Sequence, residues 1–201
     1  MERRPPIEHV IEATISSLGA ALHGRDASTH AHSQRLIGYA EALGLVLGLP
    51  QHELASLRHG VFLHDIGKIH VPDGILLNPG CLSTSEWTVM RRHPLIGYHI
   101  VSRCPWLTDA GRIVLAHHEW HNGSGYPQGL KGHEIPMGAR VCAVVDMLDA
   151  LTSHRPYRNP VGFPEACAVI QSERGTHFDP LVIDAFETIS PSRWREFSSS
   201  V

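Results

Sequence analysis

The chain centres on Leu63-His64-Asp65-Ile66-Gly67-Lys68, a polar run that leaves the apolar segment Gly60-Val61-Phe62-Leu63. A histidine beside an aspartate offers an imidazole nitrogen and a carboxylate with two oxygens. Such a carboxylate can bridge two cations about 3.5–4 Å apart, which is the spacing of two-metal hydrolytic sites. We therefore hypothesise that His64 and Asp65 nucleate a dinuclear metal centre.

Further residues of metal-binding type lie on both sides of this pair. They are His32, His93, the adjacent His117 and His118, and Asp146. Imidazole and carboxylate donors together favour iron, manganese or zinc over magnesium or calcium. Asp146 is the most informative of the other carboxylates, because it lies in the apolar stretch 139–151, where an acidic residue is costly unless it is paired, hydrogen-bonded or bound to a metal. Asp149 lies three residues later and shares its helix face.

Composition and charge exclude several classes of protein. With 201 residues, 42% of them hydrophobic and 18% charged, the chain suits one globular domain with a sizeable core. A formal net charge of −3 and the lack of a Lys/Arg block argue against a nucleic-acid polymer as partner. The four cysteines form no C-x-x-C pair, and no run of 18 apolar residues occurs. We therefore expect reduced thiols, no membrane span and a cytoplasmic location.

Apolar residues recur every three or four positions, and no strand-like alternation stands out, which predicts an all-α fold. We expect helices over residues 7–22, about 28–48, 51–64, 83–93, 96–103, 108–118, 139–151, 164–174 and 181–189. The spacing of Ser83 and Glu86 predicts a capping box. The glycine-rich stretch 122–136 is too long for a simple connection, and long structured loops are more often functional than incidental.

The motifs occur in a characteristic order. They are Asp26-x-x-Thr29-x-x-His32-x-x-Arg35, His64-Asp65-Ile66-Gly67-Lys68, His93-Pro94, His117-His118-Glu119 followed by Gly123-x-Gly125-Tyr126-Pro127, and Asp146-x-x-Asp149 with Arg155-Pro156-Tyr157-Arg158. This ordered set resembles the HD-GYP family, a branch of the HD superfamily of metal-dependent phosphohydrolases. The resemblance spans roughly Asp26 to Phe186.

The resemblance implies a fold, an activity and a ligand set. It implies a helical HD-domain bundle with a long glycine-rich GYP loop, and hydrolysis of the bacterial second messenger cyclic di-GMP to linear pGpG, to GMP or to both. It also implies two divalent metal ions, iron or manganese, with zinc, nickel or cobalt as alternatives. Asp65 and Lys68 fall on the catalytic positions. The metal ligands fall on His32, His64, Asp65, His93, His117, His118 and Asp146.

Several residues are candidates for contacts with substrate. Lys68 would place its ammonium over a non-bridging phosphate oxygen. Lys131, Arg155 and Arg158 would contact phosphate or guanine, or lie on the surface without a role. Tyr126 would wall the pocket and stack on a base, or its loop would dock partner proteins.

The expected domain organisation has three parts. Residues 1–25 form an N-terminal amphipathic helix, which packs on its own domain, connects it to another domain or forms a parallel dimer seam. Residues 26–190 form the HD-GYP domain. Residues 191–201 form a C-terminal tail with a frayed, serine-rich end.

Some positions depart from the family pattern. Asn122 and His154 stand where the family usually has Asp. Asn122 would lower activity or alter the groups that support the metal ligands, and His154 would weaken a local salt bridge. Ser28 stands where some members have a Glu that helps to hold a third metal, so we expect two metals. Glu119 would orient an imidazole or form a salt bridge. Three rival functions remain: a phosphohydrolase of another nucleotide, a catalytically weak cyclic di-GMP sensor or adaptor, and a di-iron oxygenase.

Overall fold

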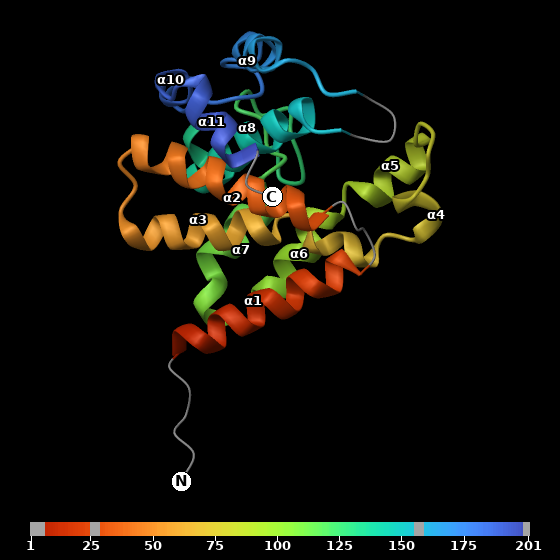
Figure 1. The fold of residues 1–201 in the computed structure, drawn as a ribbon. Helices are drawn as coiled ribbons and strands as arrows, with labels where there is room; N and C mark the ends of the chain where they lie inside the picture. Colours follow the sequence, from red (N-terminus) through yellow and green to blue (C-terminus); the bar gives the residue numbers. More distant parts are fainter. Residues whose placement is uncertain (1–6, 25–28, 155–158, 199–201) are drawn as a thin grey trace.

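The computed structural model describes residues 7–24, 29–154 and 159–198. In these ranges the chain is helical without a named strand, so the predicted all-α class is confirmed (Figure 1). The α-helices are α1 (Ile7–His23), α2 (Thr29–Val46), α3 (Gln51–Leu63), α4 (Asp73–Leu76), α5 (Thr84–Met90), α6 (His93–Val101), α7 (Thr108–Ala116), α8 (Met137–Thr152), α9 (Phe163–Ser172), α10 (Pro180–Thr188) and α11 (Pro191–Ser198). Short 3-10 turns are η1 (Ile66–His70), η2 (Pro105–Leu107) and η3 (Gly132–Glu134).

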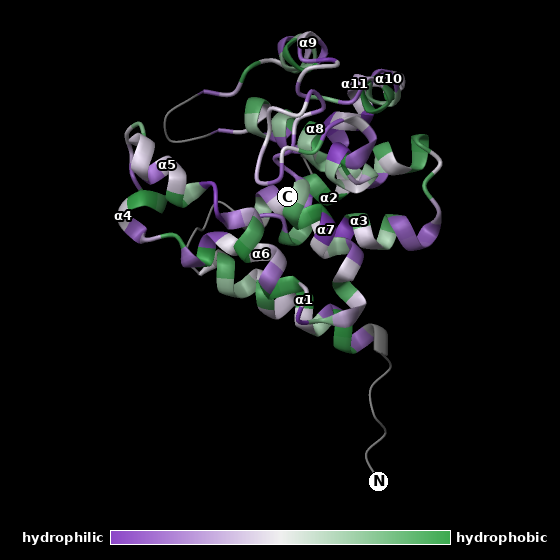
Figure 2. Cartoon of the chain, turned by 180° about the vertical axis from the view of Figure 1, so that it is seen from behind, coloured by the Kyte–Doolittle hydropathy of each residue, from purple (hydrophilic) through white to green (hydrophobic). Residues whose placement is uncertain are grey.

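The main core lies between α2, α3, α8 and the C-terminal helices. Leu36 and Leu43 of α2 are fully buried against Val145 and Leu148 of α8 and their neighbours. In Figure 2 the long helices carry hydrophobic and hydrophilic residues side by side, as amphipathic helices that pack one side on a core do. None of the helices in the described ranges is long and apolar enough to cross a membrane.

A second core lies beneath α1, which crosses the end of the molecule opposite α9 and α10 (Figure 1). Ile15 and Leu22 of α1 are buried together with Leu63, Ile66 and Val114. The N-terminal helix therefore packs on its own domain. A role as connector or dimer seam stays a prediction.

The predicted C-terminal tail is wrong for residues 191–198, which form α11. Trp194 is 1% exposed, and its ring lies 5.6 Å from that of Tyr39 and 4.9 Å from that of Phe186. Pro191 occupies the first position of α11, where proline is favoured because no helical N–H is lost there. The large buried aromatic residue then fixes the helix on the core.

The predicted helices over 83–93 and 96–103 are both present, but the boundary between them is shifted. Ser83 and Glu86 form the expected capping box, but α5 ends at Met90, and His93 begins α6. Gly67 of η1 allows η1 and α6 to approach closely: a Cβ at this position would lie 2.0 Å from the carbonyl oxygen of His93. This close approach brings the His-Asp motif beside His93.

Candidate metal centre

Three of the predicted histidine ligands are held in the same way. In each, Nδ1 hydrogen-bonds to the backbone carbonyl three residues earlier; the pairs are His64 with Val61 (2.7 Å), His93 with Met90 (2.9 Å) and His117 with Val114 (2.8 Å). A carbonyl only accepts, so Nδ1 carries a proton, and in the neutral rings of His93 and His117 Nε2 keeps its lone pair. Imidazoles oriented through one nitrogen commonly bind metals through the other.

Asp65 lies between these imidazoles. Its Oδ2 is 3.3 Å from Nε2 of His64, and its Oδ1 is 3.3 Å from Nε2 of His93. Nζ of Lys68 donates a 2.6 Å hydrogen bond to Oδ2. Burial alone would raise the pKa of Asp65, but the charges of Lys68 and His64 outweigh burial and hold the pKa well below its usual range. The side chain is therefore a carboxylate that presents one oxygen to each side.

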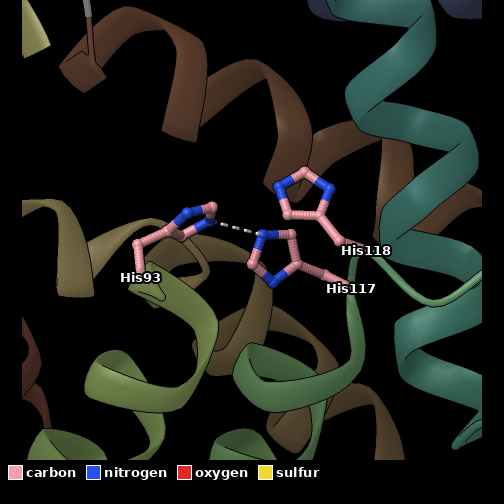
Figure 3. Close-up of side chains that lie close together, drawn as sticks. All are labelled: His93, His117 and His118. Atoms are coloured by element: carbon pink, nitrogen blue, oxygen red, sulfur yellow. Dashed lines mark hydrogen bonds between the residues drawn. The ribbon is translucent and has the colours of Figure 1, made fainter. Parts of the chain in front are cut away.

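The donors form two groups, one of which includes this carboxylate. His93, His117 and His118 make one group, and His32, His64 and Asp65 make the other; within each group the ligand atoms lie within 4.8 Å of one another. Figure 3 shows the rings of the first group converging. These groups could hold divalent metal.

The chemistry of the donors fits a cation. Nε2 of His93 lies 3.2 Å from Nε2 of His117. Burial is the main reason that the pKa of His93 falls to about 4 and that of His117 falls well below its usual range, so both rings are neutral. The lone pairs of the two Nε2 atoms then face each other, and they repel unless a cation lies near both. In the second group, burial lowers the pKa of His64, but the negative charge of Asp65 outweighs this effect and raises the pKa to about 9. Positive charge is therefore favoured at this ring too.

His32 is positioned by a buried network that sequence reasoning did not assign. Its Nδ1 lies 2.7 Å from Oδ2 of Asp149, and its Nε2 lies 3.5 Å from Oδ1 of Asp146. Asp149 is 1% exposed and also accepts hydrogen bonds of 2.6 and 3.0 Å from Arg35 and one of 3.1 Å from Ser153. Burial would raise the pKa of Asp149, but the hydrogen bonds from His32 and Arg35 outweigh it and lower the pKa to about 2.

This network had a signal in the sequence. His32 and Arg35 are one turn apart on α2, and Asp146 and Asp149 are one turn apart on α8. When the two helices pack together, the donors of the first pair can hydrogen-bond to the carboxylates of the second pair. The outcome is an ionised Asp149 that orients His32 toward the centre.

Glu119 anchors the GYP loop, which is neither of the two roles expected for it. Its carboxylate is 2% exposed and accepts the backbone N–H groups of Gln128 (2.6 Å) and Leu130 (3.0 Å). Oδ1 of Asn122 accepts from the N–H (2.9 Å) and hydroxyl (2.7 Å) of Ser124. Asn122 thus closes a local turn without a charge.

The loop places Tyr126 against the centre. Its ring stacks on His118, with centroids 4.8 Å apart and planes 29° apart, and its N–H donates to the His118 carbonyl (3.1 Å). A Cβ at Gly125 would lie 2.3 Å from the backbone nitrogen of Trp120, so only glycine fits this turn. Burial, and after it the charge of Asp65, raise the pKa of Tyr126, which keeps its hydroxyl protonated.

The remaining predicted contacts are less closely defined. Lys131 is exposed and lies beside Gly123, and its contact with substrate stays a prediction. Arg155, Arg158 and Ser28 lie outside the described residues. His154 is exposed. The structure thus brings together all seven predicted metal ligands, with Lys68 and Tyr126 beside them.

A helical bundle with a buried His-Asp centre is the arrangement of an HD domain. A family model described as HD domain matches residues 18–182, and the chain belongs to this family. Among curated relatives, the chain is 41% identical over 181 residues to the cyclic di-GMP phosphodiesterase response regulator RpfG of Xanthomonas campestris pv. campestris, which covers 89% of this chain and 48% of the relative. It is 42% identical over 164 residues to a cyclic di-GMP phosphodiesterase of Thermotoga maritima, and this match covers 81% of this chain and 45% of the relative. Together with the motifs, these relatives place the chain in the HD-GYP branch.

Other relatives act on a different cyclic dinucleotide. The chain is 34% identical over 185 residues to 3'3'-cGAMP-specific phosphodiesterase 2 of Vibrio cholerae, covering 91% of this chain and 35% of the relative. The chain spans about half the length, or less, of these curated relatives.

Solved structures share the fold. A cyclic GMP-AMP specific phosphodiesterase of V. cholerae gives a TM-score of 0.69 at 17% identity, over 93% of this chain and 50% of that chain. The HD domain of the L. monocytogenes phosphodiesterase PgpH, in complex with cyclic-di-AMP, gives a TM-score of 0.60 at 16% identity, over 91% of this chain and 92% of that chain.

Proposed function

We propose that this chain hydrolyses cyclic di-GMP in a metal-dependent reaction, giving pGpG, GMP or both. The observation that carries the proposal is the position of Asp65, which presents one oxygen to each donor group and holds the Lys68 ammonium at 2.6 Å. Two relatives named as cyclic di-GMP phosphodiesterases, 41% and 42% identical, support the substrate class.

We further propose that the site holds two divalent ions, iron or manganese. Five imidazoles with Asp65 and Asp146 form a donor set that transition metals prefer to magnesium or calcium. When bound, such ions lower the pKa of water and neutralise charge on phosphoryl oxygens.

The protein's own groups then hold and orient the substrate. Asp65 remains ionised over the working pH range because its pKa is so low. The Lys68 side chain is 26% exposed, so its ammonium is accessible to a non-bridging phosphate oxygen while it stays paired with Asp65. The ring of Tyr126 stacks on His118 at the edge of the centre, so we assign it the role of pocket wall, with a protonated hydroxyl as donor.

A metal count and a turnover assay test the proposal. The protein would be purified anaerobically, its metals counted, and cyclic di-GMP followed by chromatography for the wild type and for Asp65→Asn, which keeps the shape but loses the charge. We expect two metals per chain in the wild type and a loss of turnover of about 100-fold or more in the variant. Equal turnover by the two proteins would refute the role of Asp65.

A second candidate substrate is 3'3'-cGAMP, favoured by the V. cholerae relative at 34% identity. A panel of cyclic dinucleotides compared by kcat/KM would decide between the two, since the same ligands serve both and only base contacts differ. The sensor alternative loses part of its support, because Asn122 closes its turn without a carboxylate.

A further inference from the structure

The end of α5 brings a guanidinium to the edge of the candidate metal centre. Arg91 follows the last residue of α5 and precedes the buried His93 by two residues. Its guanidinium carbon lies 5.3 Å from the ring centroid of Tyr126, the ring that also stacks on His118. A single aromatic side chain therefore separates Arg91 from a candidate metal ligand.

Two aromatic rings lie near this guanidinium. Besides Tyr126, the ring of Trp87, one turn earlier on the chain, lies 6.0 Å from the guanidinium carbon. Such contacts use the planar face of the group, whereas its N–H donors lie in the plane and point outward. Arg91 is exposed, and in the part of the chain that the structure describes its side chain forms no ion pair with a carboxylate.

The position of α5 agrees with this placement. Figure 1 shows α4 and α5 standing out from the body of the molecule, so α5 forms a projecting wall rather than part of the core.

We propose that Arg91 binds the second phosphodiester of a cyclic dinucleotide, the one that is not being cleaved. This inference rests on the proposed function. A cyclic dinucleotide carries two phosphodiesters in one ring, so when one lies at Asp65 and Lys68, the other is displaced toward the rim. The free edge of a guanidinium matches two phosphate oxygens. Because Arg91 touches an unreactive part of the substrate, it contributes to binding more than to the chemical step.

Three substrates separate this role from its alternatives. Cyclic di-GMP has two guanines and two phosphodiesters, linear GpG has two guanines and one phosphodiester, and bis(p-nitrophenyl) phosphate has one phosphodiester and no base. Each would be measured with the metal-loaded wild type, Arg91→Gln and Arg91→Lys. Arg92→Gln is the matched control, since Arg92 is the adjacent exposed arginine. GpG would also be tested as a competitive inhibitor of cyclic di-GMP turnover.

For Arg91→Gln we expect KM for cyclic di-GMP to rise about tenfold, with kcat within about twofold of the wild type, because a charged hydrogen bond at a partly exposed site is lost. In Arg91→Lys the KM for cyclic di-GMP should rise less, and in Arg92→Gln it should stay at the wild-type value. GpG and bis(p-nitrophenyl) phosphate should be handled as by the wild type.

Four results would overturn the inference in different ways. An unchanged KM for cyclic di-GMP in Arg91→Gln would remove Arg91 from substrate binding while leaving the proposed function intact. An equal loss on GpG would show that Arg91 reads guanine, and a lower kcat on bis(p-nitrophenyl) phosphate would show that it only positions Tyr126. A wild type that turns over no cyclic di-GMP would overturn both the proposed function and this inference.

Discussion

Replacing Gly67 by alanine should dismantle the metal centre without touching any ligand. A Cβ at this position would lie 2.0 Å from the carbonyl oxygen of His93 and 2.6 Å from the nitrogen of Gly97. An ordinary contact needs about 3.4 Å, so η1 and the start of α6 must separate by about 1.4 Å. Both neighbours are backbone atoms, which cannot rotate aside as a side chain can.

The expected losses follow from this displacement. Overpacking against a rigid backbone should lower the free energy of unfolding by about 3 kcal/mol. A shift of this size also exceeds the tolerance of about 0.2 Å for metal-ligand distances, so the group that contains His93 should lose its metal. Turnover should fall about 100-fold or more, as a misplacement of about 1 Å commonly causes.

Metal analysis, urea unfolding and cyclic di-GMP turnover would be measured on Gly67→Ala and on a matched control. Gly74→Ala is that control, because Gly74 is exposed in α4 and a Cβ there meets nothing within 4 Å. It should keep its metals and gain up to about 1 kcal/mol of stability. If Gly67→Ala bound metal and turned over substrate like the wild type, the argument from close approach would be refuted.

Three further perturbations test other parts of the structure. Asp149→Asn should weaken metal binding about 10- to 100-fold, because His32 loses its charged partner; titration of the metal-free protein would measure this, and unchanged affinity would contradict the assigned role. Asp179, paired with Arg140, has its pKa lowered by this partner against the effect of burial. The wild type should therefore lose stability as the pH falls below about 4, whereas Asp179→Asn should be less stable by about 2–4 kcal/mol at pH 7 and less sensitive to acid in urea unfolding. Chelation should lower Tm by about 10 °C in the wild type and by less in Asp65→Asn, as calorimetry would show; an equal shift would argue against metal at this site.

The candidate ligands could be picked out from sequence because their types and local spacing are chemically unusual. A carboxylate such as Asp146 in an apolar helix demands a partner, and adjacent histidines after another helix suggest one. What could not be predicted was which groups orient the ligands. The bond between Asp149 and His32 joins residues 117 positions apart and depends on how α2 packs on α8.

Local signals also misled where packing decided the outcome. Ser190 and Pro191 are equally consistent with the end of α10 and the beginning of α11. Only the burial of Trp194 beneath α2 and α10 favours the second reading. Glu119 likewise carries the charge of a salt-bridge residue, but the loop folds back so that its carboxylate binds backbone N–H groups.

The carbonyls that hold His64, His93 and His117 belong to the final turns of α3, α5 and α7. Adding or deleting one residue in such a turn rotates everything after it by about 100° about the helix axis, which would swing the imidazole out of the site. Helix length should thus be as strictly constrained among natural variants as ligand identity. Insertions should instead accumulate in the intervening loops, such as residues 77–82 and 102–104, where no imidazole of the centre would be turned.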